Sequence, residues 1–176
     1  PMKAKALLKE AGLSVEDIPP IELLYNTSEG HQKIAEAIQQ MWKENLGIKI
    51  LLTNTDWKVY LSKQNEGDYE IARAGWIGDY QDPKSFLDMM VSGRGNNQTG
   101  WSNETYDNLL EKAAASPSKE QRYLYMYEAE KILMDELPII PIYTYTRIFM
   151  KHESVQGWNA NLLDSHAYQY ISISDK

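Results

Sequence analysis

The sequence predicts an α/β domain in which helices flank a mainly parallel sheet. In the first half of the 176-residue chain, short apolar runs typical of buried strands alternate with longer segments whose apolar residues recur at helical spacing. Strands and helices in this order form βαβ units, which build parallel sheets. Helix start signals (Ser, Asp) and stop signals (Gly) separate the segments, as this fold class requires.

Three helices and three strands are expected in the first half. The expected helices cover residues 3–11, the segment from Ser28 to near Gly47, and the segment from Asp56 to about residue 65. The expected strands are "IELLYN" (21–26), "IKILLTN" (48–54) and "YEIARAG" (69–75). Ser28 and Asp56 suit N-caps, and Gly47 suits the left-handed position that ends a helix. Ligands bind beyond the carboxyl ends of the strands in such sheets, so the turn after residue 75 is a candidate site.

The second half is expected to be mostly helical before an irregular tail. Pro83 begins a short helix with "KSFLDMMV", Asn103 caps the next helix, and Ser118 with Gln121 forms a capping-box pattern for a long third one. We interpret "SGRGNNQTG" (92–100) as a mobile loop. The segments "PIIPIYTYT" and "RIFMK" are expected to be extended, and "YQYISIS" (168–174) alternates like a strand.

The composition argues against several classes of function. The net charge is −7 and Lys and Arg are not clustered, which argues against a nucleic-acid partner. No apolar run approaches the roughly 20 residues that cross a membrane. The absence of Cys excludes disulfides, thiolate catalysis and Cys-bound zinc. The chain carries no His pair at ligand spacing and no phosphate-binding glycine loop, so the sequence predicts neither a metal nor a cofactor.

Two aspartates after the third strand raise the question of catalysis. Asp79 and Asp82 stand three residues apart, which is compatible with an acid/base pair. Asp82 lies directly before Pro83, so we interpret it as a helix start. Asp79 lies within the turn and has no such structural explanation. A hydrolase that uses Asp79 with Asp82 or Glu70 stays open as an alternative of another class, and we expect no enzyme.

The stretch "RAGWIGDYQDP" (73–83) combines opposite charges with aromatic side chains, which suits a binding site. Arg73 offers a planar fork of donors to a carboxylate, and Asp79 offers the opposite charge a few residues later. A zwitterion such as a peptide needs both signs separated by a gap. His31 stands in the first turn of the helix capped by Ser28, where unpaired N–H groups suit a carboxylate. The aromatic walls between the charges would be Trp57, Trp76 and Tyr80.

Several segments together resemble one family. They are "AKALLKEAG", "LLYNTSEGHQKIAEAIQQMWKENLGI", "RAGWIGDYQDPKSFLDMM", "NNQTGWSNETYDNLLEKA" and "EAEKILMDELPIIPIYTY". In this order they resemble the family 5 solute-binding proteins of bacterial ABC importers, in particular the C-terminal part of oligopeptide-binding proteins. The resemblance covers essentially the whole chain, and the order and spacing of the segments make it specific.

The resemblance implies a role for each matching residue. Asp79 matches the aspartate that binds the α-amino group of the peptide. Arg73 and His31 match positions that meet the C-terminal carboxylate of the peptide. Gln64 stands where a close relative has arginine, which places a carboxylate contact there in doubt. The remaining matches, which line side-chain pockets or form the "GWIGDY" turn, are Trp57, Trp76, Ile77, Gly78 and Tyr80.

The resemblance also implies the fold and the setting. The expected fold is a type II periplasmic-binding-protein-like lobe that is incomplete relative to the two-lobed protein. Residues 1–145 correspond to the second, C-terminal lobe from partway through it, and residues 146–176 to a segment that returns towards the first lobe. The expected function is capture of short peptides for an ABC importer and its membrane permease. The expected location is the periplasm or, as a lipoprotein, the extracellular face of the membrane. Binding of another solute (a dipeptide, a signalling peptide or a metal chelate) stays open, and the isolated chain is expected to bind weakly.

Overall fold

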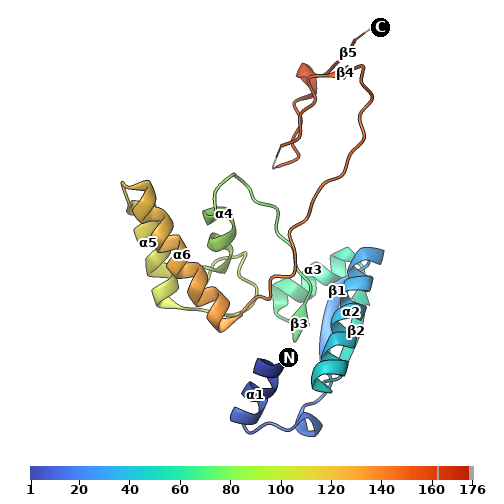
Figure 1. The fold of residues 1–176 in the computed structure, drawn as a ribbon, viewed down its shortest axis with the longest axis vertical. Coiled ribbons are helices and arrows are strands. Elements are labelled where there is room, and N and C mark those ends of the chain that lie inside the picture. Colours follow the sequence, from blue (N-terminus) through green and yellow to red (C-terminus); the bar gives the residue numbers. More distant parts are fainter. Residues whose placement is uncertain (162, 175–176) are drawn as a thin grey trace. The chain divides into compact units, whose positions relative to one another are not determined.

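The computed structural model describes residues 1–161 and 163–174 (Figure 1), and the contacts within the chain divide it into two units. The first unit is Pro1–Gly75 and the second is Trp76–Lys176. The chain therefore divides by contacts at the start of the turn that carries Asp79. The boundary at residue 145, which is drawn from the lobes of the family, stays a prediction.

A parallel three-stranded sheet forms the centre of the first unit. The strands are β1 (Ile21–Asn26), β2 (Ile50–Thr55) and β3 (Ile71–Ala72), in the order β2-β1-β3. The helix α2 (Glu29–Leu46) connects β1 to β2, and α3 (Trp57–Glu66) connects β2 to β3. The crossover from β1 to β2 runs one way across the sheet, and the crossover from β2 past β1 to β3 runs the other way. Because both are right-handed, the two helices lie on opposite faces of the sheet. The predicted α/β fold class with a parallel sheet is confirmed.

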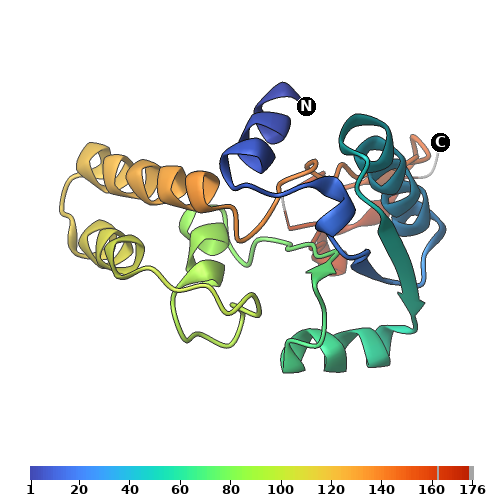
Figure 2. The same cartoon turned by 90° about the horizontal axis from the view of Figure 1, so that it is seen from below.

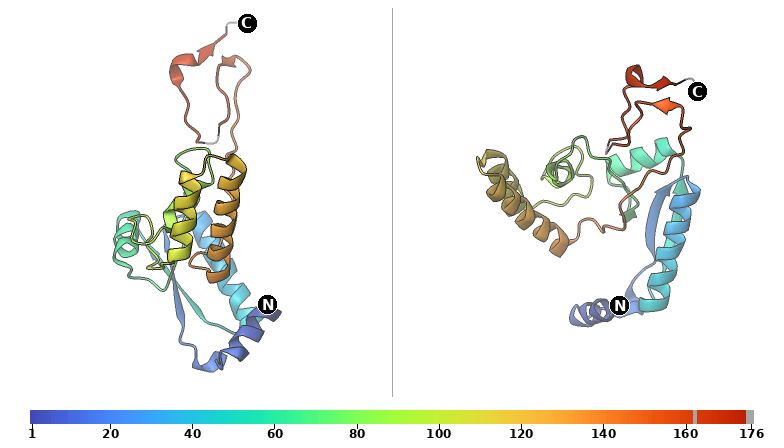
Figure 3. Two further views of the ribbon diagram at one scale, coloured as in Figure 1. Left: turned by 90° about the vertical axis from the view of Figure 1, so that its left-hand side faces the viewer. Right: turned by 45° about the horizontal axis from the view of Figure 1, so that its top comes forward.

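The core of this unit lies between the sheet and α2, which run alongside each other (Figure 3). Leu23 and Tyr25 of β1 pack in one cluster with Ala35 of α2 and with Ile48 and Ile50. Leu24 points to the opposite face, because side chains alternate along a strand, and it is fully buried. Two further elements precede the sheet, α1 (Met2–Glu10) and the 3-10 turn η1 (Val15–Asp17).

Local signals explain where the helices of the first unit begin and end. Asp56 caps α3, since its carboxylate accepts hydrogen bonds from the backbone N–H groups of Lys58 (3.0 Å) and Val59 (3.2 Å). Gly47 ends α2 in the left-handed conformation, at φ 77°. Ser28 stands at the N-cap of α2, as predicted, but its side chain makes no capping hydrogen bond.

The third strand is shorter than the predicted 69–75. The backbone N–H of Arg73 still donates to Leu24 (2.8 Å), but the Arg73 carbonyl accepts a hydrogen bond from the hydroxyl of Tyr60 on α3. The Arg73 carbonyl, which would otherwise continue the hydrogen bonds between β1 and β3, is therefore bonded to α3. The chain leaves the sheet after Arg73. A local sequence pattern does not reveal this contact.

The second unit is built on a helical hairpin that packs on a short helix (Figure 2). The hairpin consists of α5 (Glu104–Ala115) and α6 (Lys119–Glu136), and the short helix α4 (Lys84–Leu87) continues as the 3-10 turn η2 (Asp88–Met90). Its core contains Leu87, Met90, Tyr106, Leu110, Ala113, Met126, Ala129 and Leu133. Asn103 and Ser118 cap α5 and α6 as predicted.

The C-terminal part of this unit is irregular. Residues 141–150 form neither helix nor strand, and β4 (Val155–Gln156) pairs antiparallel with β5 (Ser172–Ile173). The predicted strand over 168–174 is wrong for residues 168–170, which form the 3-10 turn η3 (Tyr168–Tyr170). The partner strand β4 ends at Gln156, and Gly157 follows it in the left-handed conformation, at φ 75°. Among the described residues, every helix is too short or too polar to cross a lipid bilayer.

Tyr106 links α5 to α4 through one buried hydrogen bond, from its hydroxyl to the Leu87 carbonyl (2.6 Å). Replacement of Tyr106 by Phe leaves that carbonyl without its donor, so we expect the free energy of unfolding to fall by about 1–2 kcal/mol. Urea denaturation measures this change. The control, Tyr127→Phe, changes a tyrosine that is 57% exposed and should have almost no effect. An equal loss in both variants would contradict the structural role of Tyr106.

Candidate functional site

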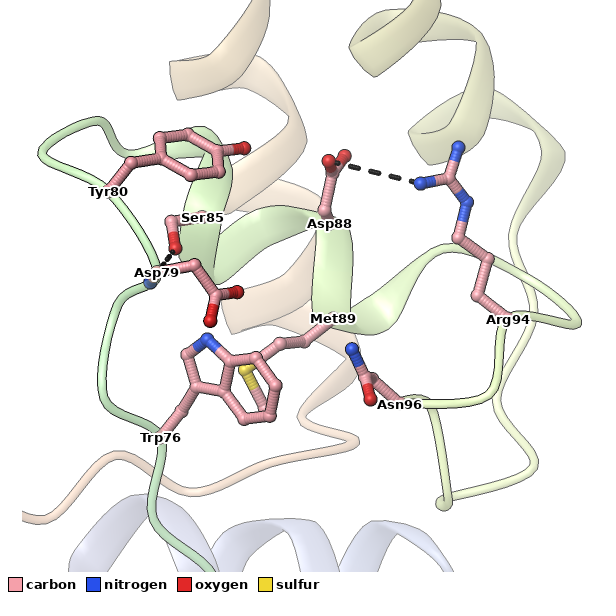
Figure 4. Close-up of a pocket in the computed structure, with 8 residues that line it drawn as sticks. All are labelled: Trp76, Asp79, Tyr80, Ser85, Asp88, Met89, Arg94 and Asn96. Carbon is pink, nitrogen blue, oxygen red and sulfur yellow. Dashed lines mark hydrogen bonds and ion pairs between the residues drawn. The ribbon is translucent and has the colours of Figure 1, made fainter.

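The turn between β3 and α4 contributes to a pocket of about 170 Å³ in the second unit (Figure 4). Asp79 lies on this turn, and its carboxylate points towards the ring of Trp76. The loop between η2 and α5 closes the opposite side. The pocket is lined by Trp76, Asp79, Tyr80, Ser85, Asp88, Met89, Arg94 and Asn96.

Two contacts with α4 fix the backbone around Asp79. The Asp79 N–H donates to the hydroxyl of Ser85 (2.7 Å), which is 4% exposed. Gly78 lies against the ring of Phe86, and a Cβ at this position would stand only 3.1 Å from two ring atoms. A glycine at 78 therefore allows the turn to approach α4 closely, and Ser85 holds the turn there. Ser85 is not among the predicted site residues, because nothing near it in the sequence indicates a bond to residue 79.

The charged groups around the pocket differ in how they are neutralised. Asp88 forms an ion pair with Lys84 (2.5 Å) and a longer one with Arg94 (3.9 Å). Within the described residues, no cation lies within ion-pair distance of Asp79. Asp79 thus adds a negative charge to the pocket that the unit does not compensate.

Trp76 presents a second polar group beside Asp79. Its indole Nε1 is buried, and the part of the chain that the structure describes supplies no acceptor for it. Figure 4 shows the nitrogen edge of the ring turned towards the Asp79 carboxylate. Tyr80 flanks the same pocket and is 43% exposed, whereas Ile77 is 67% exposed and does not line it. Trp76, Asp79 and Tyr80 therefore lie together, with Gly78 in the supporting turn.

Asp82 is engaged in the structure of the turn. Its carboxylate accepts two hydrogen bonds from the Arg122 guanidinium of α6 (2.7 and 2.8 Å) and one from the backbone N–H of Lys84 (2.9 Å). The bonds to Arg122, foremost, lower the pKa of Asp82. The interpretation of Asp82 as a helix start agrees with the bond to Lys84, although α4 begins at Lys84.

The other predicted site residues lie in the first unit, at the carboxyl edge of its sheet. His31 is the third residue of α2, and Arg73 directly follows β3. Burial lowers the pKa of His31, and the positive charge of Arg73 lowers it further. His31 is therefore neutral at pH 7 and offers a hydrogen bond rather than a charge.

Trp57 extends this group along α3. It is 56% exposed and stacks on Tyr60, with ring centroids 5.4 Å apart. Tyr60 in turn donates to the backbone carbonyl of Arg73. The structure thus connects Trp57, His31 and Arg73 in the first unit, and gathers Trp76, Asp79 and Tyr80 in the second. In the described residues, no group of three or more His, Asp or Glu side chains could hold a metal ion.

These features are those of a ligand-binding α/β domain, and comparisons with known proteins identify its family. Residues 1–98 match the model of the middle part of bacterial extracellular solute-binding proteins, family 5. The oligopeptide-binding protein OppA of Bacillus subtilis is 44% identical over 152 residues, which cover 85% of this chain and 28% of that protein. The periplasmic murein peptide-binding protein MppA of Escherichia coli is 40% identical over 166 residues, which cover 94% of this chain and 31% of that protein.

Solved structures agree with this assignment. The structure of E. coli MppA superposes on this chain with a TM-score of 0.87 and 36% sequence identity. The match includes 99% of this chain and 35% of the MppA chain. The structure of Haemophilus influenzae OppA in complex with the peptide RPPGFSPFR matches with a TM-score of 0.85 and 33% sequence identity. The match includes 96% of this chain and 33% of the OppA chain. The chain belongs to the family 5 extracellular solute-binding proteins, and it spans about a third of the length of these relatives.

Replacement of Asp82 by Asn tests the structural role of the Arg122 pair. We expect the free energy of unfolding at pH 7 to fall by about 1–3 kcal/mol, because a charge-assisted bidentate contact is lost. The pKa of Asp82 is lower in the folded state, so the pair stabilises the fold above pH 4 and this stabilisation disappears as pH falls further.

Urea midpoints of the protein and the variant at pH 7 and pH 2 measure this effect. The difference between them should be large at pH 7 and small at pH 2. The exposed Asp135, replaced by Asn, is the control and should leave both midpoints nearly unchanged. A stability difference for Asp82→Asn that is as large at pH 2 as at pH 7 would contradict the role of the Asp82 charge.

Proposed function

We propose that this chain supplies part of the ligand-binding surface of a substrate-binding protein that captures oligopeptides for an ABC importer. The observation that carries the proposal is the uncompensated carboxylate of Asp79 in a pocket whose backbone is fixed by Ser85 and Gly78. A carboxylate fixed in this way suits the free α-amino group of a peptide. The names of the relatives, which include oligopeptide- and murein peptide-binding proteins, support this ligand class.

The carboxyl edge of the sheet in the first unit, taken by itself, suits a carboxylate group of a peptide. Arg73 carries a permanent positive charge there, and His31 adds a neutral donor. The N-terminus of α2 has no side-chain cap, so its N–H groups are available to a carboxylate. Trp57 and Trp76 are suited to contact apolar parts of the ligand.

The setting of the protein follows from the same family. We infer that the protein is not an enzyme, that it works outside the cytoplasmic membrane, in the periplasm or as a lipoprotein, and that it delivers peptides to a membrane permease. The engagement of Asp82 by Arg122 and Lys84 supports a binding role, because it occupies one member of the carboxylate pair that a hydrolase would use. The lobe boundary near residue 145 is part of this proposal.

Replacement of Asp79 by Asn tests the amine contact, because it removes the charge and keeps the shape. In the protein at its native length, we expect the affinity for Ala-Ala-Ala to fall about 10- to 100-fold, as for the loss of a charge-assisted hydrogen bond. Isothermal titration calorimetry measures the affinity. N-acetylated Ala-Ala-Ala should bind weakly to both proteins.

The control is Glu111→Gln on α5, which removes one exposed carboxylate that does not line the pocket and should leave the affinity unchanged. If Asp79→Asn binds Ala-Ala-Ala as tightly as the parent protein, Asp79 does not bind the amine. If the parent protein binds no tripeptide, the proposed ligand class is wrong.

A further inference from the structure

The pocket beside Asp79 contains polar groups that an amine contact does not use. Arg94 and Asn96 come from the loop between η2 and α5 and line the pocket together with Asp88 (Figure 4). Figure 4 shows the Asn96 side chain on the side of the pocket across from Asp79. These groups are therefore placed to contact other parts of a ligand whose amine binds Asp79.

The loop that carries Arg94 and Asn96 is held by hydrogen bonds to its own backbone. The side-chain amide of Asn97 donates to the carbonyls of Met90 (3.1 Å), Val91 (3.4 Å) and Trp101 (2.9 Å). The Asp107 carboxylate accepts from the N–H of Ser92 (3.0 Å) at the start of the loop. The loop thus presents Arg94 and Asn96 from a fixed backbone, which lowers the entropy cost of a contact with a ligand.

The charge of Arg94 is only weakly engaged by the protein. Its one ion pair in the described chain joins its Nη1 to Asp88 at 3.9 Å, and its side chain is 60% exposed. Asp88 is already neutralised by Lys84 at 2.5 Å, so it needs no second cation. Arg94 therefore keeps donors for another carboxylate, and its planar fork suits two parallel hydrogen bonds.

We propose that Arg94, with Asn96 beside it, forms a subsite for the first side chain of the peptide and favours an acidic one, Asp or Glu. This inference rests on the proposed function, since it takes the amine to lie on Asp79. The first side chain branches from the carbon atom that carries the amine, so it is the part of the peptide that we place in this pocket beside the amine. A basic first side chain would meet the positive charge of Arg94, and a neutral one would leave the guanidinium unused.

Three peptides that differ only in the first residue test this subsite: Glu-Ala-Ala, Gln-Ala-Ala and Lys-Ala-Ala. For the protein at its native length and low ionic strength, we expect Glu-Ala-Ala to bind about 3- to 10-fold more tightly than Gln-Ala-Ala, as for a partly exposed ion pair. Lys-Ala-Ala should bind most weakly. The preference for Glu should shrink as salt is added.

Arg94→Gln should bring the ratio of the Glu-Ala-Ala and Gln-Ala-Ala affinities to about one, with the affinity for Gln-Ala-Ala changed less than twofold. Arg94→Lys keeps the charge but not the fork and should retain part of the preference. The control is Lys112→Gln, which removes one exposed charge on α5 and should keep the full ratio. Thermal unfolding of each variant verifies that the fold is intact.

The outcomes separate this inference from the proposed function. Equal affinities for Glu-Ala-Ala and Gln-Ala-Ala in the parent protein, or an unchanged ratio in Arg94→Gln, would overturn the subsite. In both cases the effect of Asp79→Asn on Ala-Ala-Ala would still support amine binding. A parent protein that binds none of the tripeptides would overturn the proposed function and the subsite with it.

Discussion

The ion pair between Asp82 and Arg122 holds the turn that carries the candidate site. Residues 76–83 contain neither helix nor strand, so regular backbone hydrogen bonding cannot fix their position. Arg122 lies on α6, which packs against α5 and contacts α4, so the pair ties the turn to the core of the second unit. The bond from Asp79 to Ser85 can hold its geometry because this attachment keeps the turn on α4.

Three aspartates close together in the sequence, Asp79, Asp82 and Asp88, differ in how their charges are compensated. Asp82 is neutralised by the Arg122 guanidinium of α6, and Asp88 at the start of η2 is neutralised by Lys84 of the preceding α4. Asp79 receives no such partner among the described residues. An uncompensated carboxylate in a partly exposed pocket lowers the free energy of unfolding only a little, because water solvates it. Its negative charge attracts a cationic ligand.

Local signals were sufficient to predict most of the fold. The bounds of β1 match the predicted 21–26, because a buried strand between Pro20 and Thr27 has clear ends. Asp56 and Gly47 were recognised because caps depend on residues next to the helix. The end of β3 was not predictable, since it is determined by the hydroxyl of Tyr60 from another element. For the same reason the sequence indicated Asp79 and Trp76 but not Ser85 or Arg94, which reach the pocket from α4 and from a loop.

The anchored loop at residues 92–100 has a consequence for how binding preference can diversify. Asn97 holds the loop through backbone carbonyls, and carbonyls are present whatever the side chains at Arg94 and Asn96 are. Substitutions at these two positions can therefore alter what the pocket recognises without disturbing the support of Asp79. On the proposed function, ligand preference can change at the loop while Asp79 and its supporting contacts are kept.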